Sequence, residues 1–279
     1  MDLQLTGLRV LVTGGTRGIG RAVVENFLAE GASVAFCARD ADAVKATQGN
    51  LTRADTKVIG SALNVADAAA LAEWVTGSAE RLGGIDIVVS NVSALAIPET
   101  DENWTASFEV DLMGAVRLVR AALPFLETSS AASIVAISSV SGREIDFAAG
   151  PYGTIKAALI HYMQGLANQL ASKGIRANAI SPGNTYFEGG VWASIKLNNP
   201  DFFATALDLN PSGRMATPDE IARTVVFVAS PASSRTSGAN ILVDGALTRG
   251  VQFWNPNPCV LRRRAEGLVN LVGALYLGQ

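Results

Sequence analysis

Three side chains that could donate, accept or stabilise a proton beside a carbonyl group lie close together in the sequence, near the middle of the chain: Ser139, Tyr152 and Lys156. Four residues advance a helix by about 400° and about 6 Å, so Tyr152 and Lys156 would project from one helix face. A phenol has an ordinary pKa of about 10, and a neighbouring ammonium favours the phenolate, which suits acid/base chemistry near neutral pH. Taken alone such a pair is more often two surface side chains, and Ser139 strengthens the chemical interpretation.

The elements that must carry these groups can be predicted from hydropathy. Residues 133–138 are expected to form a strand, which would put Ser139 just past its carboxyl end. A helix is expected from Pro151, a residue suited to a first turn, to about Ser172. Its first turns would carry both Tyr152 and Lys156.

A glycine-rich segment near the N-terminus adds a possible nucleotide site. The apolar residues 9–13 predict a strand, glycines follow at 14, 18 and 20, and helical periodicity continues to about Glu30. Glycines allow close approach of the backbone to a ligand, and the N–H groups at a helix start favour an anion such as a nucleotide diphosphate. The spacing fits the usual dinucleotide pattern only loosely, so a glycine-rich turn without a ligand is the alternative.

Strands and helices are expected to alternate along the chain. Apolar strands without a polar face, joined by short connections, indicate a parallel sheet covered by helices on both sides. Further strands are expected at 33–38, 57–63 and 85–90, and further helices at 41–51, 67–82 and 101–127.

Composition limits the class of protein. The chain has 279 residues, of which 49% are hydrophobic, and a formal charge of −3, so we expect one large domain and no nucleic-acid partner. No leader and no membrane-spanning run is evident, which favours a cytoplasmic protein. The two cysteines, Cys37 and Cys259, form no ligand cluster, so neither a disulfide framework nor a metal site is indicated.

In order and spacing, Thr13-Gly14-x-x-x-Gly18-x-Gly20, Ser139 and Tyr152-x-x-x-Lys156 resemble the short-chain dehydrogenase/reductase family, particularly its 3-oxoacyl reductases. The resemblance covers residues 1–250 as one NAD(P)-binding domain. It implies an α/β, single-domain, Rossmann-like doubly wound sheet of seven mainly parallel strands in the order 3-2-1-4-5-6-7, with helices on both faces.

The resemblance also implies a reaction. Hydride would pass from NADPH to a ketone or 3-oxo carbonyl, with Tyr152 as the proton donor, Ser139 bonded to the same oxygen, and Lys156 holding the ribose and stabilising the phenolate. The expected cofactor-binding residues are Gly14, Thr16, Arg17, Gly18, Ile19, Gly20, Arg39, Asn64, Val65, Asn91, Tyr152, Lys156, Pro182, Gly183 and Thr185.

The cofactor preference has its own signal. NAD users of the family usually have an acidic residue at the end of the second strand, where this chain has Ala38. Arg39 follows it, and Arg17 lies within the glycine loop, so two guanidinium groups could bind a 2′-phosphate. NADP(H) is therefore favoured over NAD(H), although Asp40 is an acidic residue nearby.

The chain departs from the family pattern at three places, of which Asn64 in place of a frequent aspartate is the mildest. Residues 90–93, Ser-Asn-Val-Ser, replace the usual Asn-Asn-Ala-Gly, which adds bulk beside the cofactor. Asp111 stands where the family commonly has an asparagine in a proton relay. Asp111 is therefore a candidate catalytic residue that would add negative charge near Lys156.

The alternation of elements breaks at about 184–214, the expected substrate lid. Its apolar and aromatic residues favour a small hydrophobic carbonyl or alcohol substrate, with Ser139, Ile145, Tyr186 and Trp192 as candidate contacts. The aromatic residues could instead simply anchor the lid to the rest of the domain.

The last expectations concern the assembly of the protein and its C-terminal residues. By analogy with the family, a homotetramer or homodimer is expected. Residues 251–279 are expected to form a C-terminal extension that is flexible or lies at an interface. Two other functions stay open, an NAD-dependent secondary-alcohol dehydrogenase and a dinucleotide-binding regulator without turnover.

Overall fold

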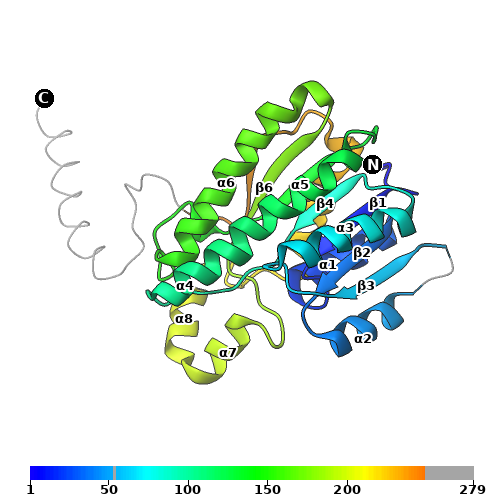
Figure 1. Cartoon of the computed structure of the whole chain (residues 1–279). Helices are drawn as coiled ribbons and strands as arrows, with labels where there is room; N and C mark the ends of the chain where they lie inside the picture. The colour runs from blue at the N-terminus through cyan, green and yellow to red at the C-terminus, as the bar shows by residue number, and fades with distance from the viewer. Residues whose placement is uncertain (53–54, 249–279) are drawn as a thin grey trace, which may run out of the picture. The chain divides into compact units, whose positions relative to one another are not determined.

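The computed structural model describes residues 1–52 and 55–248, in which seven parallel strands form a sheet (Figure 1). The order β3-β2-β1-β4-β5-β6-β7 confirms the expected topology. The strand order reverses between β1 and β4, which is where a doubly wound sheet binds its ligand. The strands are β1 Arg9–Thr13, β2 Ser33–Ala38, β3 Val58–Ala62, β4 Ile87–Ser90, β5 Ser133–Ile137, β6 Arg176–Pro182 and β7 Asn240–Val243.

Helices cover both faces of this sheet. Helices α3, α5 and α6 pack on one face, and α1, α2 and α9 pack on the other. These helices are α1 Gly18–Ala29, α2 Ala41–Leu51, α3 Ala68–Leu82, α5 Gly114–Leu126, α6 Pro151–Leu170 and α9 Pro218–Ala229.

The central strand β1 illustrates why the strands appear in the sequence as continuous apolar runs. Successive side chains point to opposite faces, so Val10 and Val12 enter one core and Leu11 enters the other. All three side chains are fully buried. Because helices cover both faces, neither face of the strand can carry polar residues.

The segment expected as one long helix over 101–127 is instead interrupted. Helix α4, Asp101–Ala106, and α5 are joined by a π-helical turn, Ser107–Met113. A π-helical turn is a local widening that often occurs at functional sites. Ser107 and Asp111 lie on this turn and are only 1% and 2% exposed, so the turn carries a carboxylate into the interior.

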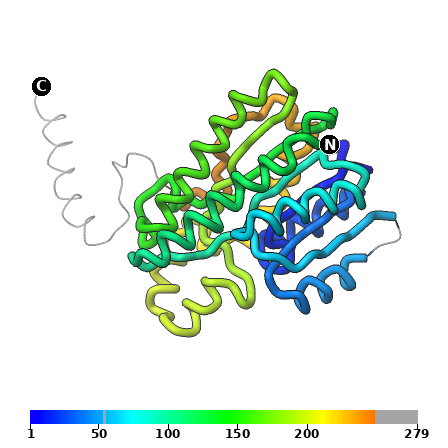
Figure 2. Tube along the Cα trace, in the orientation of Figure 1, coloured from blue at the N-terminus to red at the C-terminus, as the bar shows by residue number. Residues whose placement is uncertain are grey.

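The expected lid contains two short helices, α7 Val191–Asn198 and α8 Pro200–Asp208. Figure 2 shows this segment beyond the end of the sheet, apart from the helices that cover its faces. Trp192 is buried in a small core of its own, where it stacks with Phe202 and meets Phe203 edge-on. Aromatic packing therefore gives the lid a fixed shape.

Met1–Leu247 form one compact unit. The expected extension over 251–279 lies outside the described residues. Among the residues that are described, no helix has the length and apolar character needed to cross a bilayer.

Candidate active site

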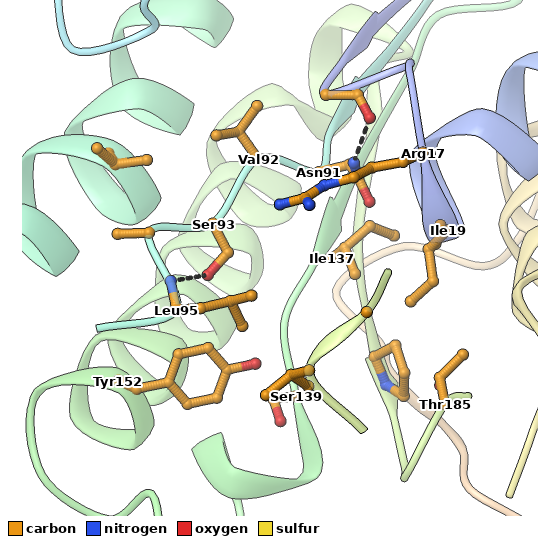
Figure 3. A pocket seen from close by; sticks show the side chains of 18 of the residues that line it. Arg17, Ile19, Asn91, Val92, Ser93, Leu95, Ile137, Ser139, Tyr152 and Thr185 are labelled. Atoms are coloured by element: carbon orange, nitrogen blue, oxygen red, sulfur yellow. Dashed lines mark hydrogen bonds between the residues drawn. The ribbon is translucent and has the colours of Figure 1, made fainter. Parts of the chain in front are cut away.

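A cavity of about 740 Å³ lies at the carboxyl ends of the central strands. Gly14 lines it just after β1, Asn91 after β4, Ser139 after β5 and Gly183 after β6. Its volume is in the range usual for cofactor and substrate sites. Figure 3 shows the side chains that converge on it.

The glycine loop, residues 14–20, can form only with glycine at key positions. Gly14 and Gly18 have φ angles of +74° and +54°, which disfavour other residues. A Cβ on Gly20 would lie 2.1 Å from the carbonyl oxygen of Gly14. The Asn91 amide donates to the carbonyl oxygens of Thr13 and Gly14, at 3.0 and 3.2 Å, and so ties the loop to β4.

Helix α1 begins in this loop without a cap. Its N-cap residue, Arg17, makes no side-chain cap hydrogen bond, and the first turn holds no acidic residue. The N–H groups and the positive end of the helix dipole are therefore available to an anion in the cavity. The loop thus fits the pyrophosphate of a dinucleotide.

Two arginines add positive charge to the cavity. Arg17 and Arg39 both line it, beside Ala38 at the end of β2. Asp40 lines the cavity too, and one of its carboxylate oxygens accepts the Ala43 N–H at 3.0 Å and caps α2.

Ser139, Tyr152 and Lys156 line the same cavity. Ser139 follows β5, and both Tyr152 and Lys156 lie in the first two turns of α6, which begins with Pro151 as expected. In Figure 3 the hydroxyl of Tyr152 points toward Ser139. The fold therefore brings the three groups predicted from spacing to one place.

Lys156 is buried as a charged group with a counter-charge. Its ammonium lies 3.0 Å from the carboxylate of Asp111 and donates to the carbonyl oxygen of Ile137 at 3.0 Å. Burial alone lowers the pKa of Lys156, but Asp111 and Tyr152 outweigh it, and the pKa is raised. The ammonium lies 5.6 Å from the ring centre of Tyr152. An ammonium has three donors, so one remains for a group in the cavity.

The remaining residues expected at the cofactor also line the cavity. They are Thr16, Ile19, Asn64, Val65, Pro182, Gly183 and Thr185.

Two of the residues expected at the substrate, Ile145 and Tyr186, are not among the residues that line the cavity. The Ile145 side chain is 94% exposed. Tyr186 packs on Phe203, and its hydroxyl donates to Glu188. Trp192, by contrast, lies in the cavity wall. Hydropathy alone cannot tell which side of a loop faces a ligand.

Three cavity residues were not assigned from sequence. Phe147 meets Trp192 edge-on, and both residues line the cavity. The ring of Phe187 lies against Gly18, where an added Cβ would come within 2.6 Å of it. Leu95 has a φ of +51°, rare for a bulky residue, and lies above Tyr152 in Figure 3. In the sequence, Phe147 and Phe187 could have been identified only as aromatic residues in or beside predicted loops. Nothing in the sequence placed Leu95 at the cavity.

Comparisons with known proteins agree with this geometry. A family model described as enoyl-(acyl carrier protein) reductase matches residues 14–248. An isoepoxydon dehydrogenase from Aspergillus clavatus is 44% identical over 259 residues, which cover 90% of this chain and 98% of that protein. An uncharacterized oxidoreductase from Bacillus subtilis is 34% identical and covers 90% of this chain and all of its own length.

Solved structures have the same fold with a cofactor bound. L-sorbose reductase from Gluconobacter frateurii, complexed with NADPH and L-sorbose, superposes with a TM-score of 0.84 at 27% identity over 90% of this chain and 100% of its own. A short-chain dehydrogenase from Burkholderia cenocepacia in complex with NADP gives 0.78 at 28% identity, over 88% and 99%. The chain therefore belongs to the short-chain dehydrogenase/reductase family of NAD(P)-dependent oxidoreductases.

Proposed function

We propose that this protein uses NADPH to reduce the carbonyl group of a small ketone to a secondary alcohol, in a reversible reaction. The observation that carries the proposal is that Ser139, Tyr152 and Lys156 line the same cavity as the glycine loop and the uncapped start of α1. A proton donor and a phosphate site thus share one cavity.

The nicotinamide cofactor supplies the hydride when it is bound. The start of α1 would hold its pyrophosphate, Asn64 and Val65 would contact the adenosine, and Pro182, Gly183 and Thr185 would lie beside the nicotinamide.

The side chains of this protein handle the proton. Tyr152 gives its phenolic proton to the carbonyl oxygen as negative charge develops there, and Ser139 donates a hydrogen bond to the same oxygen. The buried ammonium of Lys156 stabilises the phenolate that Tyr152 becomes. Asp111 keeps that ammonium charged, so it acts through Lys156 as a positioning residue. In oxidation the same groups act in reverse.

Replacement of the phenol tests this assignment. Tyr152→Phe is expected to abolish turnover while NADPH binding, followed by cofactor fluorescence, stays within about twofold of wild type, because the ring remains and only the proton donor is lost. Retained turnover would remove Tyr152 from the role of acid.

The preference for NADPH is supported by Arg17 and Arg39 at the cavity and by Ala38, which is not acidic, at the end of β2. A 2′-phosphate suits two guanidinium forks. Substitution of both arginines by alanine is expected to reduce the ratio of kcat/KM for NADPH over NADH by about 100-fold, since hydrogen bonds to charged groups contribute about 1.5–3 kcal/mol each. A wild-type enzyme that prefers NADH would overturn this part.

We propose a compact substrate with a ring or short chain beside the carbonyl. The cavity wall near Tyr152 is largely apolar, with Leu95, Phe147 and Trp192. The related isoepoxydon dehydrogenase and L-sorbose reductase are named for small molecules. A panel of isoepoxydon with NADP⁺, and of L-sorbose, tropinone and a 3-oxoacyl thioester with NADPH, followed at 340 nm, tests the substrate class. Reaction with none of these would contradict the proposal, and an enoyl thioester tests the activity that the family model's description names.

A second candidate is physiological oxidation of a secondary alcohol. The 44% identical relative is named a dehydrogenase, which favours it. The ratio of kcat/KM for isoepoxydon oxidation to that for ketone reduction at pH 7 distinguishes the two directions.

We also propose a homotetramer or homodimer that acts in the cytoplasm. Phe108, on the π-helical turn, is 44% exposed, as expected of an apolar residue that a second copy covers. Light scattering after gel filtration measures the assembly, and a monomer would contradict it.

A further inference from the structure

The turn that carries Ser139 is pressed against the helix that carries Tyr152. An added Cβ on Gly142, in the turn, would lie 2.7 Å from the backbone carbon of Lys156. An added Cβ on Gly153, in α6, would lie 2.8 Å from the carbonyl oxygen of Ser141. The two backbones therefore approach closely, which fixes the Ser139 turn against α6.

A chain of hydrogen bonds joins the Ser139 turn to the loop that precedes α6. Ser141 donates its backbone N–H to the Oγ of Ser139 at 3.1 Å, and the two hydroxyl oxygens lie 3.2 Å apart. The Ser141 hydroxyl also lies 2.6 Å from Oδ2 of Asp146, while Oδ1 accepts the Ala148 N–H at 2.8 Å. Asp146 thus links the Ser139 turn to the residues just before Tyr152.

Donor and acceptor counting fixes the direction of these bonds. An ionised carboxylate only accepts, so the one hydroxyl proton of Ser141 goes to Asp146. The Ser141 oxygen can then only accept from Ser139, whose own oxygen already accepts the Ser141 N–H. The Ser139 hydroxyl is therefore set as a donor along this chain, with one lone pair used by the Ser141 N–H. At 3.2 Å, the hydrogen bond from Ser139 to Ser141 is longer than is usual between hydroxyl groups, so Ser139 can readily exchange it for a hydrogen bond to a carbonyl oxygen.

We propose that Asp146 and Ser141 are positioning residues that hold Ser139 as a hydrogen-bond donor toward the substrate oxygen. The proposal rests on the reductase function above and deepens it. A developing alkoxide is an acceptor, so a serine fixed as a donor stabilises it, whereas a freely rotating serine spends part of its time in other orientations. Asp146 lines the cavity, so the arrangement lies at the reacting end.

A mutant cycle on kcat/KM for ketone reduction tests the chain of bonds. Asp146→Ala and Ser141→Ala are each expected to lower kcat/KM about tenfold, mainly through kcat, because each removes about one hydrogen bond's contribution. The double variant is expected to lose about tenfold rather than about 100-fold, and neither change is expected to matter further in a Ser139→Ala background. Additive losses, or full activity in both single variants, would overturn the proposal.

Two controls separate positioning from folding. Glu144→Gln removes a charge from the same loop, but the Glu144 carboxylate pairs with Arg143 and not with Ser139. This variant is expected to leave kcat/KM unchanged. Asp146→Asn keeps an acceptor oxygen and is expected to lose less than Asp146→Ala. Thermal midpoints and NADPH binding are expected to stay at wild-type values, since Asp146 is an exposed residue.

Crystal structures give a test that does not depend on turnover. Wild type is expected to hold Ser139 in one rotamer, bonded to the Ser141 N–H, and Asp146→Ala is expected to show a second rotamer. An unchanged single rotamer would refute the proposal even if the natural substrate were never found. Absence of any reductase activity in wild type, by contrast, would count against the proposed function.

Discussion

Asp111→Asn probes the buried pair on which the charge of Lys156 depends. One carboxylate oxygen lies 3.0 Å from the Lys156 ammonium, and the other accepts the Ala94 N–H at 2.7 Å. Both side chains are 2% exposed. An amide has the same shape but a single acceptor oxygen, so one of the two donors must lose its partner, and the ammonium loses its counter-charge.

The expected cost follows from these contacts. Loss of one partner of a buried pair costs about 3–5 kcal/mol, and the amide keeps one of the two hydrogen bonds, so we expect a loss of about 3 kcal/mol in the free energy of unfolding. For a domain of this size such a loss corresponds to a decrease of about 6–12 °C in the thermal midpoint.

The pH dependence gives a second, independent readout. The pKa of Lys156 is raised in wild type, so the stabilisation from the charged pair is complete below about pH 10.5 and is lost as the pH rises through the raised value. Without Asp111, burial acts on an uncompensated ammonium and lowers that pKa. The alkaline limb of the kcat/KM profile is therefore expected to move to lower pH in Asp111→Asn.

Urea denaturation and pH–rate profiles of the purified enzyme measure both effects. Glu109→Gln is the matched control, because it removes the same charge from the same π-helical turn but breaks only a half-exposed pair with Arg117, at 2.8 Å. We expect it to cost less than about 1 kcal/mol. If Asp111→Asn loses no more stability than this control and keeps the wild-type alkaline limb, the reasoning is refuted.

Other contacts predict separate outcomes. Arg176 donates to four carbonyl oxygens around the end of α9, so Arg176→Met is expected to lower the free energy of unfolding by about 2–4 kcal/mol in urea titrations, and a change below about 0.5 kcal/mol would contradict this. Burial opposes ionisation of Asp86, but hydrogen bonds, chiefly from Arg9, lower its pKa. Its stabilisation is therefore present above about pH 4 and lost as the pH falls through the lowered value, and Asp86→Asn is expected to flatten this acid dependence. Leu95→Gly relieves a backbone strain of about 1 kcal/mol and opens the cavity. It is expected to keep the thermal midpoint and to raise kcat/KM for a bulkier ketone about tenfold relative to a compact one. An unchanged ratio would show that Leu95 does not restrict substrate size.

Most helices and strands of the fold could be predicted from local sequence patterns. The alternation of strands and helices followed from apolar runs that end in glycines or polar residues, as at Gly14 and Ser139, whereas the strand order was implied by the resemblance to the family. The helical spacing of Tyr152 and Lys156 depends only on the 3.6-residue period, which α6 keeps.

Features that depend on tertiary contacts were not predictable. The π-helical turn at Ser107–Met113 has no local signature, so the pairing of Asp111 with Lys156 could be suspected only from the family pattern. Ile145 was expected at the substrate because it is apolar, yet packing directs it to solvent. By contrast, Asp40 directly precedes the helix, so its role as the α2 cap can be predicted from sequence, and its bond from the Ala43 N–H confirms it.

Deuteride transfer tests the central claim, that Tyr152 protonates a carbonyl which receives hydride in this cavity. The ketone with the highest kcat/KM in the substrate panel is incubated with NADPH deuterated at both C4 positions, and the alcohol is analysed by mass spectrometry and NMR. We predict one deuterium on the carbinol carbon with wild type and no alcohol with Tyr152→Phe. Alcohol that lacks deuterium at this carbon, or deuterated alcohol formed as fast by Tyr152→Phe, would contradict the account.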